Sequence, residues 1–85
     1  MGFDWKGFEN EKTAAFFTCE PEYRVFLENC EMRGYKWASG CLPTQGLSYI
    51  HGLGYVVFML DGAMRYSGMW YATKRGYKVT KFKQA

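Results

Sequence analysis

The sequence predicts a single α+β domain over residues 1–85, with one long helix and a second short helix on a small, mainly antiparallel sheet of about five strands. Three observations support this fold class. The chain has 85 residues, 48% of them hydrophobic, which suffices for one core. Apolar residues recur at helical spacing within residues 20–33, and Asp61–Gly62 separates two apolar runs as a two-residue hairpin turn does. The expected element order is β-α-β-β-β-α-β.

Residues 1–11 are predicted to form an irregular N-terminal arm, and residues 12–85 the α+β core. The arm carries three aromatic side chains that we expect to lie against the core: Phe3, Trp5 and Phe8. The compact apolar run at residues 12–19 predicts the first strand.

The long helix is predicted to follow this strand. Pro21 suits its first turn, because the N–H that proline lacks would be unpaired there anyway. Gly34 can adopt the left-handed conformation that ends a helix, and residues 35–39 are expected to leave as a strand. Residues at i, i+3, i+4 and i+7 form one apolar stripe, which should be buried: Tyr23, Phe26, Leu27 and Cys30.

The tetrapeptide RGYK occurs twice, at residues 33–36 and 75–78. In both copies a basic last helical turn would precede a terminating glycine and a tyrosine that starts a strand. Ser67 is a candidate N-cap for the short helix before the second copy. The repeat therefore predicts a helix-to-strand corner in both places and not a duplicated domain.

The predicted strand at residues 55–60 is apolar on both faces. A strand covered by a helix on one side only would alternate with polar residues. We expect the second face to be covered by the N-terminal arm, by the loop at residues 40–54 or by another copy of the protein. This loop contains four glycines and one proline, and its length predicts flexibility.

The net charge of +3 is unevenly distributed along the chain. Residues 1–31 carry seven acids and three bases, whereas residues 65–83 carry six bases and no acid. In this C-terminal stretch cations alternate with aromatic rings, which can neutralise phosphates and stack on bases. The same mixture also suits a protein interface or a solvated face that pairs with the acidic half. The candidate ligand-binding residues are Arg65, Tyr66, Trp70, Tyr71, Lys74, Arg75 and Lys78, with His51 from the loop.

Catalysis and metal binding find little support in the sequence. Cys41 and His51 could form a nucleophilic dyad, but no known motif surrounds either residue. Cys19, Cys30, Cys41 and His51 could supply four zinc ligands, yet they lack the close cysteine pairs of structural zinc sites. We expect a non-enzymatic protein without metal or cofactor. The longest apolar run has strand length, so no membrane association is expected.

Several short motifs follow one another between residues 12 and 82. They are a K-x-A strand, a helix containing F-L, the sequence G-Y-K-W and a terminal G-Y-x-V-x-x-F, formed here by Lys12, Ala14, Phe26, Leu27, Gly34, Tyr35, Lys36, Trp37, Gly76, Tyr77, Val79 and Phe82. This order resembles a group of small accessory proteins encoded by phages and prophages of Gram-positive bacteria.

The resemblance implies an anti-defence protein that acts in the cytoplasm of the infected bacterial host. We expect a homo-oligomer that binds a nucleotide-like anionic small molecule, such as a cyclic or ADP-ribose-like immune signal, and sequesters it without cleavage. One alternative is a protein-level inhibitor of a host defence protein, for instance a CRISPR nuclease. Another is a small nucleic-acid-binding regulator, which the basic C-terminal half would suit.

Overall fold

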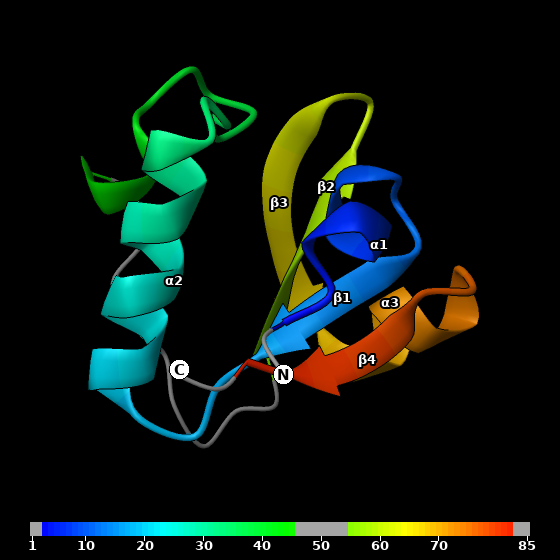
Figure 1. Ribbon diagram of the computed structural model, residues 1–85. Helices are drawn as coiled ribbons and strands as arrows, with labels where there is room; N and C mark the ends of the chain where they lie inside the picture. Colours follow the sequence, from blue (N-terminus) through cyan, green and yellow to red (C-terminus); the bar gives the residue numbers. More distant parts are fainter. Residues whose placement is uncertain (1–2, 46–54, 83–85) are drawn as a thin grey trace.

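The structure is a computed structural model that describes residues 3–45 and 55–82 (Figure 1). It confirms the α+β class, with three helices and a four-stranded mixed sheet of order β3-β2-β1-β4. The elements in chain order are α1 (Trp5–Glu9), β1 (Thr13–Phe16), α2 (Glu20–Met32), a 3-10 turn η1 (Pro43–Gln45), β2 (Tyr55–Leu60), β3 (Ala63–Gly68), α3 (Met69–Lys74) and β4 (Lys78–Lys81).

The sheet is mainly antiparallel as predicted, because β1–β2 and β2–β3 pair antiparallel, but it is mixed, because β1 pairs parallel with β4. The predicted number of about five strands is wrong, since the sheet has four. The expected strand at residues 35–39 is reduced to one parallel bridge between Trp37 and Met64. The chain turns away directly after this bridge, because the Gly40 N–H bonds to the carbonyl of Trp37 at 2.8 Å and Gly40 has a φ of +93°. A left-handed glycine turn therefore stops the fifth strand after one residue.

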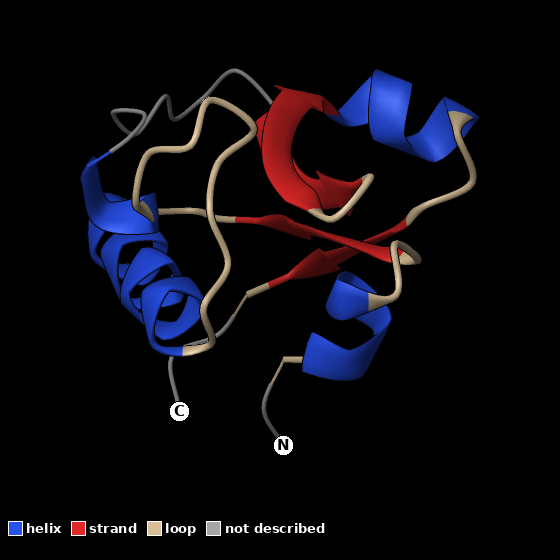
Figure 2. Cartoon of the chain, turned by 90° about the horizontal axis from the view of Figure 1, so that it is seen from above, coloured by secondary structure: helices blue, strands red, loops and turns tan. Residues whose placement is uncertain are grey.

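Helices cover both faces of the sheet. One cluster of buried side chains joins α1 and α2 to one face, and a second joins α3 to the other. Figure 2 shows α1 and α3 on opposite sides of the strands. In β2, Val57 belongs to the first cluster, whereas Val56 and Phe58 belong to the second. The cover of the second face is thus α3, which was not among the covers expected from the sequence. α3 follows β3 without a loop and packs back over the neighbouring strand β2.

The N-terminal arm contains a short helix, α1, where the sequence predicted irregular structure. Asp4 caps it by accepting a hydrogen bond from the Gly7 N–H at 3.0 Å. Gly7 lowers the helix propensity of this segment, so the sequence does not predict a helix here. The helix nevertheless requires a residue without a side chain at this position. A Cβ on Gly7 would lie 2.3 Å from Oδ2 of Asp4. The expectation that the arm packs on the core is confirmed, since Phe3 and Phe8 are buried.

The first RGYK copy closes α2 with paired backbone hydrogen bonds. Gly34 has a φ of +84°, and its N–H bonds to the Glu31 carbonyl at 3.1 Å. The Tyr35 N–H reaches back to the Cys30 carbonyl at 3.0 Å. This is the Schellman arrangement of a glycine-terminated helix. The Tyr35 ring lies 5.9 Å from the ring of Phe8, on the α2 side of the sheet.

The second RGYK copy repeats the same bonds on the opposite side of the sheet. Gly76 has a φ of +91°, its N–H bonds to the Thr73 carbonyl, and the Tyr77 N–H bonds to the Ala72 carbonyl, both at 3.0 Å. Tyr77 is buried and its hydroxyl donates to the Met59 carbonyl. Burial raises the pKa of Tyr77, so the hydroxyl keeps this donated proton. The predicted helix-to-strand corner is confirmed here, where β4 follows, whereas the first copy leads into the bridge at Trp37.

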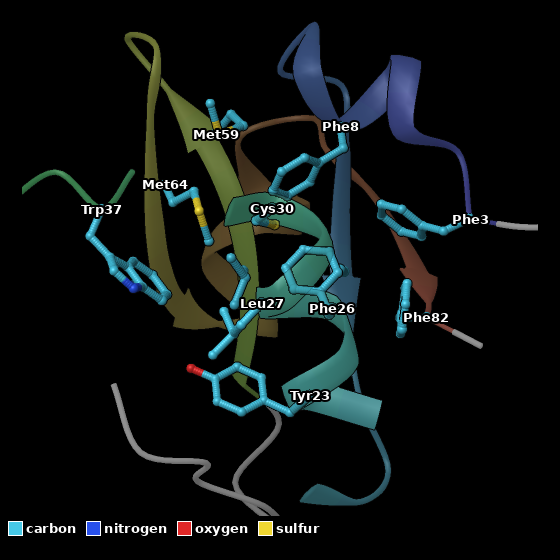
Figure 3. Close-up of a cluster of buried hydrophobic side chains, with 12 residues drawn as sticks. Phe3, Phe8, Tyr23, Phe26, Leu27, Cys30, Trp37, Met59, Met64 and Phe82 are labelled. Carbon is cyan, nitrogen blue, oxygen red and sulfur yellow. The ribbon is translucent and has the colours of Figure 1, made fainter. Parts of the chain in front are cut away.

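The larger core cluster lies between α2, the N-terminal arm and the sheet (Figure 3). The predicted stripe of α2 is buried throughout, at Tyr23, Phe26, Leu27 and Cys30. Phe26 lies at the centre of this cluster and is completely buried. Its ring centroid is within 6 Å of the centroids of five other aromatic rings: Phe3, Trp5, Phe8, Phe17 and Phe82. Aromatic packing therefore ties both ends of the described chain to the long helix.

Candidate functional site: an aromatic cleft at the β3 edge

A cleft of about 680 Å³ opens beside β3, the edge strand of the sheet. One wall is the turn after the first RGYK copy, and the opposite wall is the start of α3. The β2–β3 hairpin supplies the rest of the lining. Asp61 and Gly62 form its expected two-residue turn, with positive φ angles of 56° and 79°. The lining residues are Trp37, Ala38 and Ser39 from the turn, Phe58, Leu60, Met64, Arg65, Tyr66, Ser67 and Gly68 from the hairpin, and Trp70 and Tyr71 from α3.

The alternation of β3 distributes its side chains over the two sides of the sheet. Arg65 pairs with Phe58, whose side chain packs under α3. Tyr66 pairs with Val57 and lies on the other side, where its ring centroid is 6.5 Å from that of Trp37. Trp37 is itself held in place, because its Nε1–H donates to the Pro43 carbonyl at 3.1 Å. The edge of β3 therefore has Tyr66 and Trp37 on one side and Arg65 on the other.

Trp70 is the most exposed aromatic ring of the described chain, with 71% of its surface accessible. It lies directly against the backbone of Gly68, where an added Cβ would be 2.8 Å from the indole Nε1. Its ring packs edge-on against Tyr71 at a centroid distance of 5.9 Å, and Tyr71 in turn lies 6.0 Å from Phe58. An exposed aromatic ring beside a concave surface lined by further aromatic side chains is typical of a ligand-binding surface.

The charge of the cleft comes from Arg65, and no acidic side chain lines it within the described part of the chain. Lys74 and Arg75 lie at the far end of α3, outside the lining. Arg75 instead braces Tyr71, with its guanidinium 5.6 Å from the ring centre and Nη1 donating to the hydroxyl at 3.3 Å. Lys78 is on β4, at the opposite edge of the sheet.

The structure thus brings together four of the eight residues predicted for ligand binding: Arg65, Tyr66, Trp70 and Tyr71. The other three basic residues do not line the cleft, although Arg75 contacts Tyr71 from outside it. His51 lies outside the described residues. Sequence reasoning missed Trp37 and Ser39. They come from a segment remote in sequence, and the Trp37–Met64 bridge that brings them to β3 leaves no pattern to detect.

None of the three cysteines lines the cleft. Cys19 and Cys41 are exposed, and Cys30 is buried under α2. Burial raises the pKa of the Cys30 thiol well above its ordinary value, which keeps it protonated and unreactive. Residues 3–45 and 55–82 contain no group of three or more side chains placed to hold a metal ion. His51, the predicted partner of Cys41 in a nucleophilic dyad, lies outside the described residues.

None of the helices in the described ranges has the length and apolarity needed to cross a membrane. Comparisons of the chain with protein-family models, with curated proteins and with solved structures found no match.

Proposed function

We propose that the protein binds a nucleotide-like anionic small molecule in the β3 cleft and holds it without cleaving it. The observation that supports this proposal is that the exposed Trp70 and Arg65 line the same cleft, which no described acidic residue lines. Stacking of a base on an aromatic side chain contributes about 1–3 kcal/mol. A guanidinium binds phosphate oxygens through a planar pair of N–H donors.

The positive charge of the cleft favours a ligand with few negative charges. Arg65 is the basic residue of the described lining, whereas Lys74 lies at the far end of α3 and Lys78 at the opposite edge of the sheet. A cyclic phosphodiester carries one negative charge per phosphate, whereas a phosphate monoester carries nearly two at neutral pH. An ADP-ribose-like ligand has two phosphates to neutralise. A cyclic mononucleotide, with one phosphodiester charge, therefore matches the cleft better than an ADP-ribose isomer or a cyclic dinucleotide, each of which has two phosphates.

Sequestration in this proposal is a matter of mass action. A protein that binds a signalling nucleotide lowers its free concentration, and no general base, nucleophile or metal is needed for that. The proposal assigns this role to a phage accessory protein in the cytoplasm of an infected bacterium, working as a homo-oligomer. Such a protein acts stoichiometrically, so its effect on the host depends on its abundance and its dissociation constant.

Isothermal titration calorimetry against cyclic mononucleotides, cyclic dinucleotides and ADP-ribose isomers tests this function. We expect a cyclic nucleotide to bind with one site per cleft and to be recovered intact by chromatography after incubation. Light scattering on the same samples should show a homo-oligomer. The proposal is wrong if no member of the panel binds, or if the bound nucleotide is hydrolysed.

A further inference from the structure

The backbone of β3 presents hydrogen-bonding groups along the outer edge of the sheet. The two-residue turn pairs Leu60 with Ala63, so every second residue from Met64 onward directs its N–H and carbonyl away from β2. The groups of Met64 are used, since its N–H bonds to the Lys36 carbonyl at 2.8 Å and its carbonyl accepts from the Ala38 N–H at 3.0 Å. The next outward positions are Tyr66 and Gly68.

Two backbone groups at these positions bond to none of the described residues. Between residues 3–45 and 55–82, no backbone hydrogen bond from another element reaches the Tyr66 carbonyl or the Gly68 N–H. The chain that covers Met64 has already turned away at Gly40. The Gly68 carbonyl accepts a hydrogen bond from the Ser67 hydroxyl at 3.0 Å. The Gly68 N–H is therefore the group of this residue that could bond to a ligand. An acceptor and a donor two residues apart thus lie on a strand edge that lines the cleft.

We propose that this edge binds the rim of a nucleobase, with the Tyr66 carbonyl accepting a hydrogen bond and the Gly68 N–H donating one. Each base carries a donor and an acceptor side by side in its ring plane. Trp70 lies against Gly68, so a base bonded there would lie close to an exposed indole ring, and such rings stack on bases. This inference rests on the proposed function. It narrows the ligand to a heterocycle with a hydrogen-bond donor and an acceptor side by side in its ring plane, and it excludes aromatic anions that lack this pair.

Two substitutions at Gly68 isolate the N–H donor. Gly68 has a φ of −63° and ψ of 152°, which proline adopts without strain, and the preceding Ser67 is in an extended strand. Gly68→Ala and Gly68→Pro both add a Cβ that displaces Trp70, but only proline removes the N–H. We expect Gly68→Pro to bind the tightest cyclic nucleotide about tenfold more weakly than Gly68→Ala. Equal affinity of the two variants would overturn the inference.

A ligand-side measurement covers the case in which Gly68→Pro does not fold. Wild-type protein is titrated with the 3′,5′-cyclic monophosphates of adenosine, guanosine, cytidine and uridine, and then with the tightest binder methylated at the ring nitrogen of its rim. Methylation at N1 of guanine or N3 of uracil keeps the ring and the charge. For adenine or cytosine, where methylation would leave a cationic base, the ring nitrogen is replaced by C–H instead. We expect the modified nucleotide to bind about tenfold more weakly or worse. If it binds as tightly as its parent, the backbone groups of the edge do not bind the rim, although the proposed function stands. If none of the four nucleotides binds, both proposals fall.

Discussion

Replacement of Phe26 by alanine is expected to lower the free energy of unfolding by about 4 kcal/mol, enough to unfold much of so small a domain. Phe26 is completely buried, and its ring stacks on Trp5 at 5.3 Å with an interplanar angle of 11°. It also contacts rings from both ends of the described chain, Phe3 and Phe82. Alanine would leave a cavity that α1 and β4 cannot fill without moving, because both are held by other contacts.

Urea denaturation followed by circular dichroism measures this effect. The matched control is Met32→Ala on the same helix, where the side chain is 80% exposed and the change should stay within about 0.5 kcal/mol. A Phe26→Ala protein as stable as this control would show that the α2 stripe is not the centre of the core.

Replacement of Arg65 by glutamine is expected to weaken binding of the cyclic nucleotide by about tenfold to a hundredfold. The substitution keeps a polar side chain of similar length but removes the charge, and hydrogen bonds to a charged group contribute about 1.5–3 kcal/mol. Arg65 is exposed and makes no ion pair with another described residue, so little loss of stability should accompany the change. Calorimetry at constant salt concentration gives the ratio of dissociation constants.

Lys74→Gln is the control for charge. It removes the same unit of charge from a neighbouring element but lies outside the cleft. We expect it to change the affinity by less than about twofold, because separated exposed charges are screened by salt. If Lys74→Gln weakens binding as much as Arg65→Gln, the nucleotide is held by the general positive charge of the C-terminal half and not by the cleft.

Local patterns predicted much of this fold. The four-residue stripe of α2, the Asp61–Gly62 hairpin and the glycine corner at residues 75–78 each depend on neighbours in sequence, and each is present. The interactions that differ from expectation are non-local. The parallel pairing of β1 with β4 joins residues at opposite ends of the chain, and no local pattern specifies it.

The candidate site was predicted in part for the same reason. A stretch in which rings and cations alternate indicated residues 65–78 as the candidate region, and four of its predicted residues line the cleft. The pattern could not distinguish the two sides of a strand or the two ends of a helix. Arg65 and Tyr66 lie on opposite sides of β3. Trp70, at the start of α3, lines the cleft, whereas Lys74, at the end of the same helix, does not. The backbone groups at the β3 edge are invisible in the sequence, since every residue type supplies them.

A two-dimensional ¹H–¹⁵N NMR titration with the tightest cyclic nucleotide tests the location of the site most directly. The amide signals of Tyr66 and Gly68 and the indole signal of Trp70 are expected to shift together and to saturate at one nucleotide per cleft. Signals from Lys78 to Lys81, at the opposite edge of the sheet, should stay in place. Saturable shifts confined to that opposite edge, or no shifts at all, would contradict nucleotide binding in the β3 cleft.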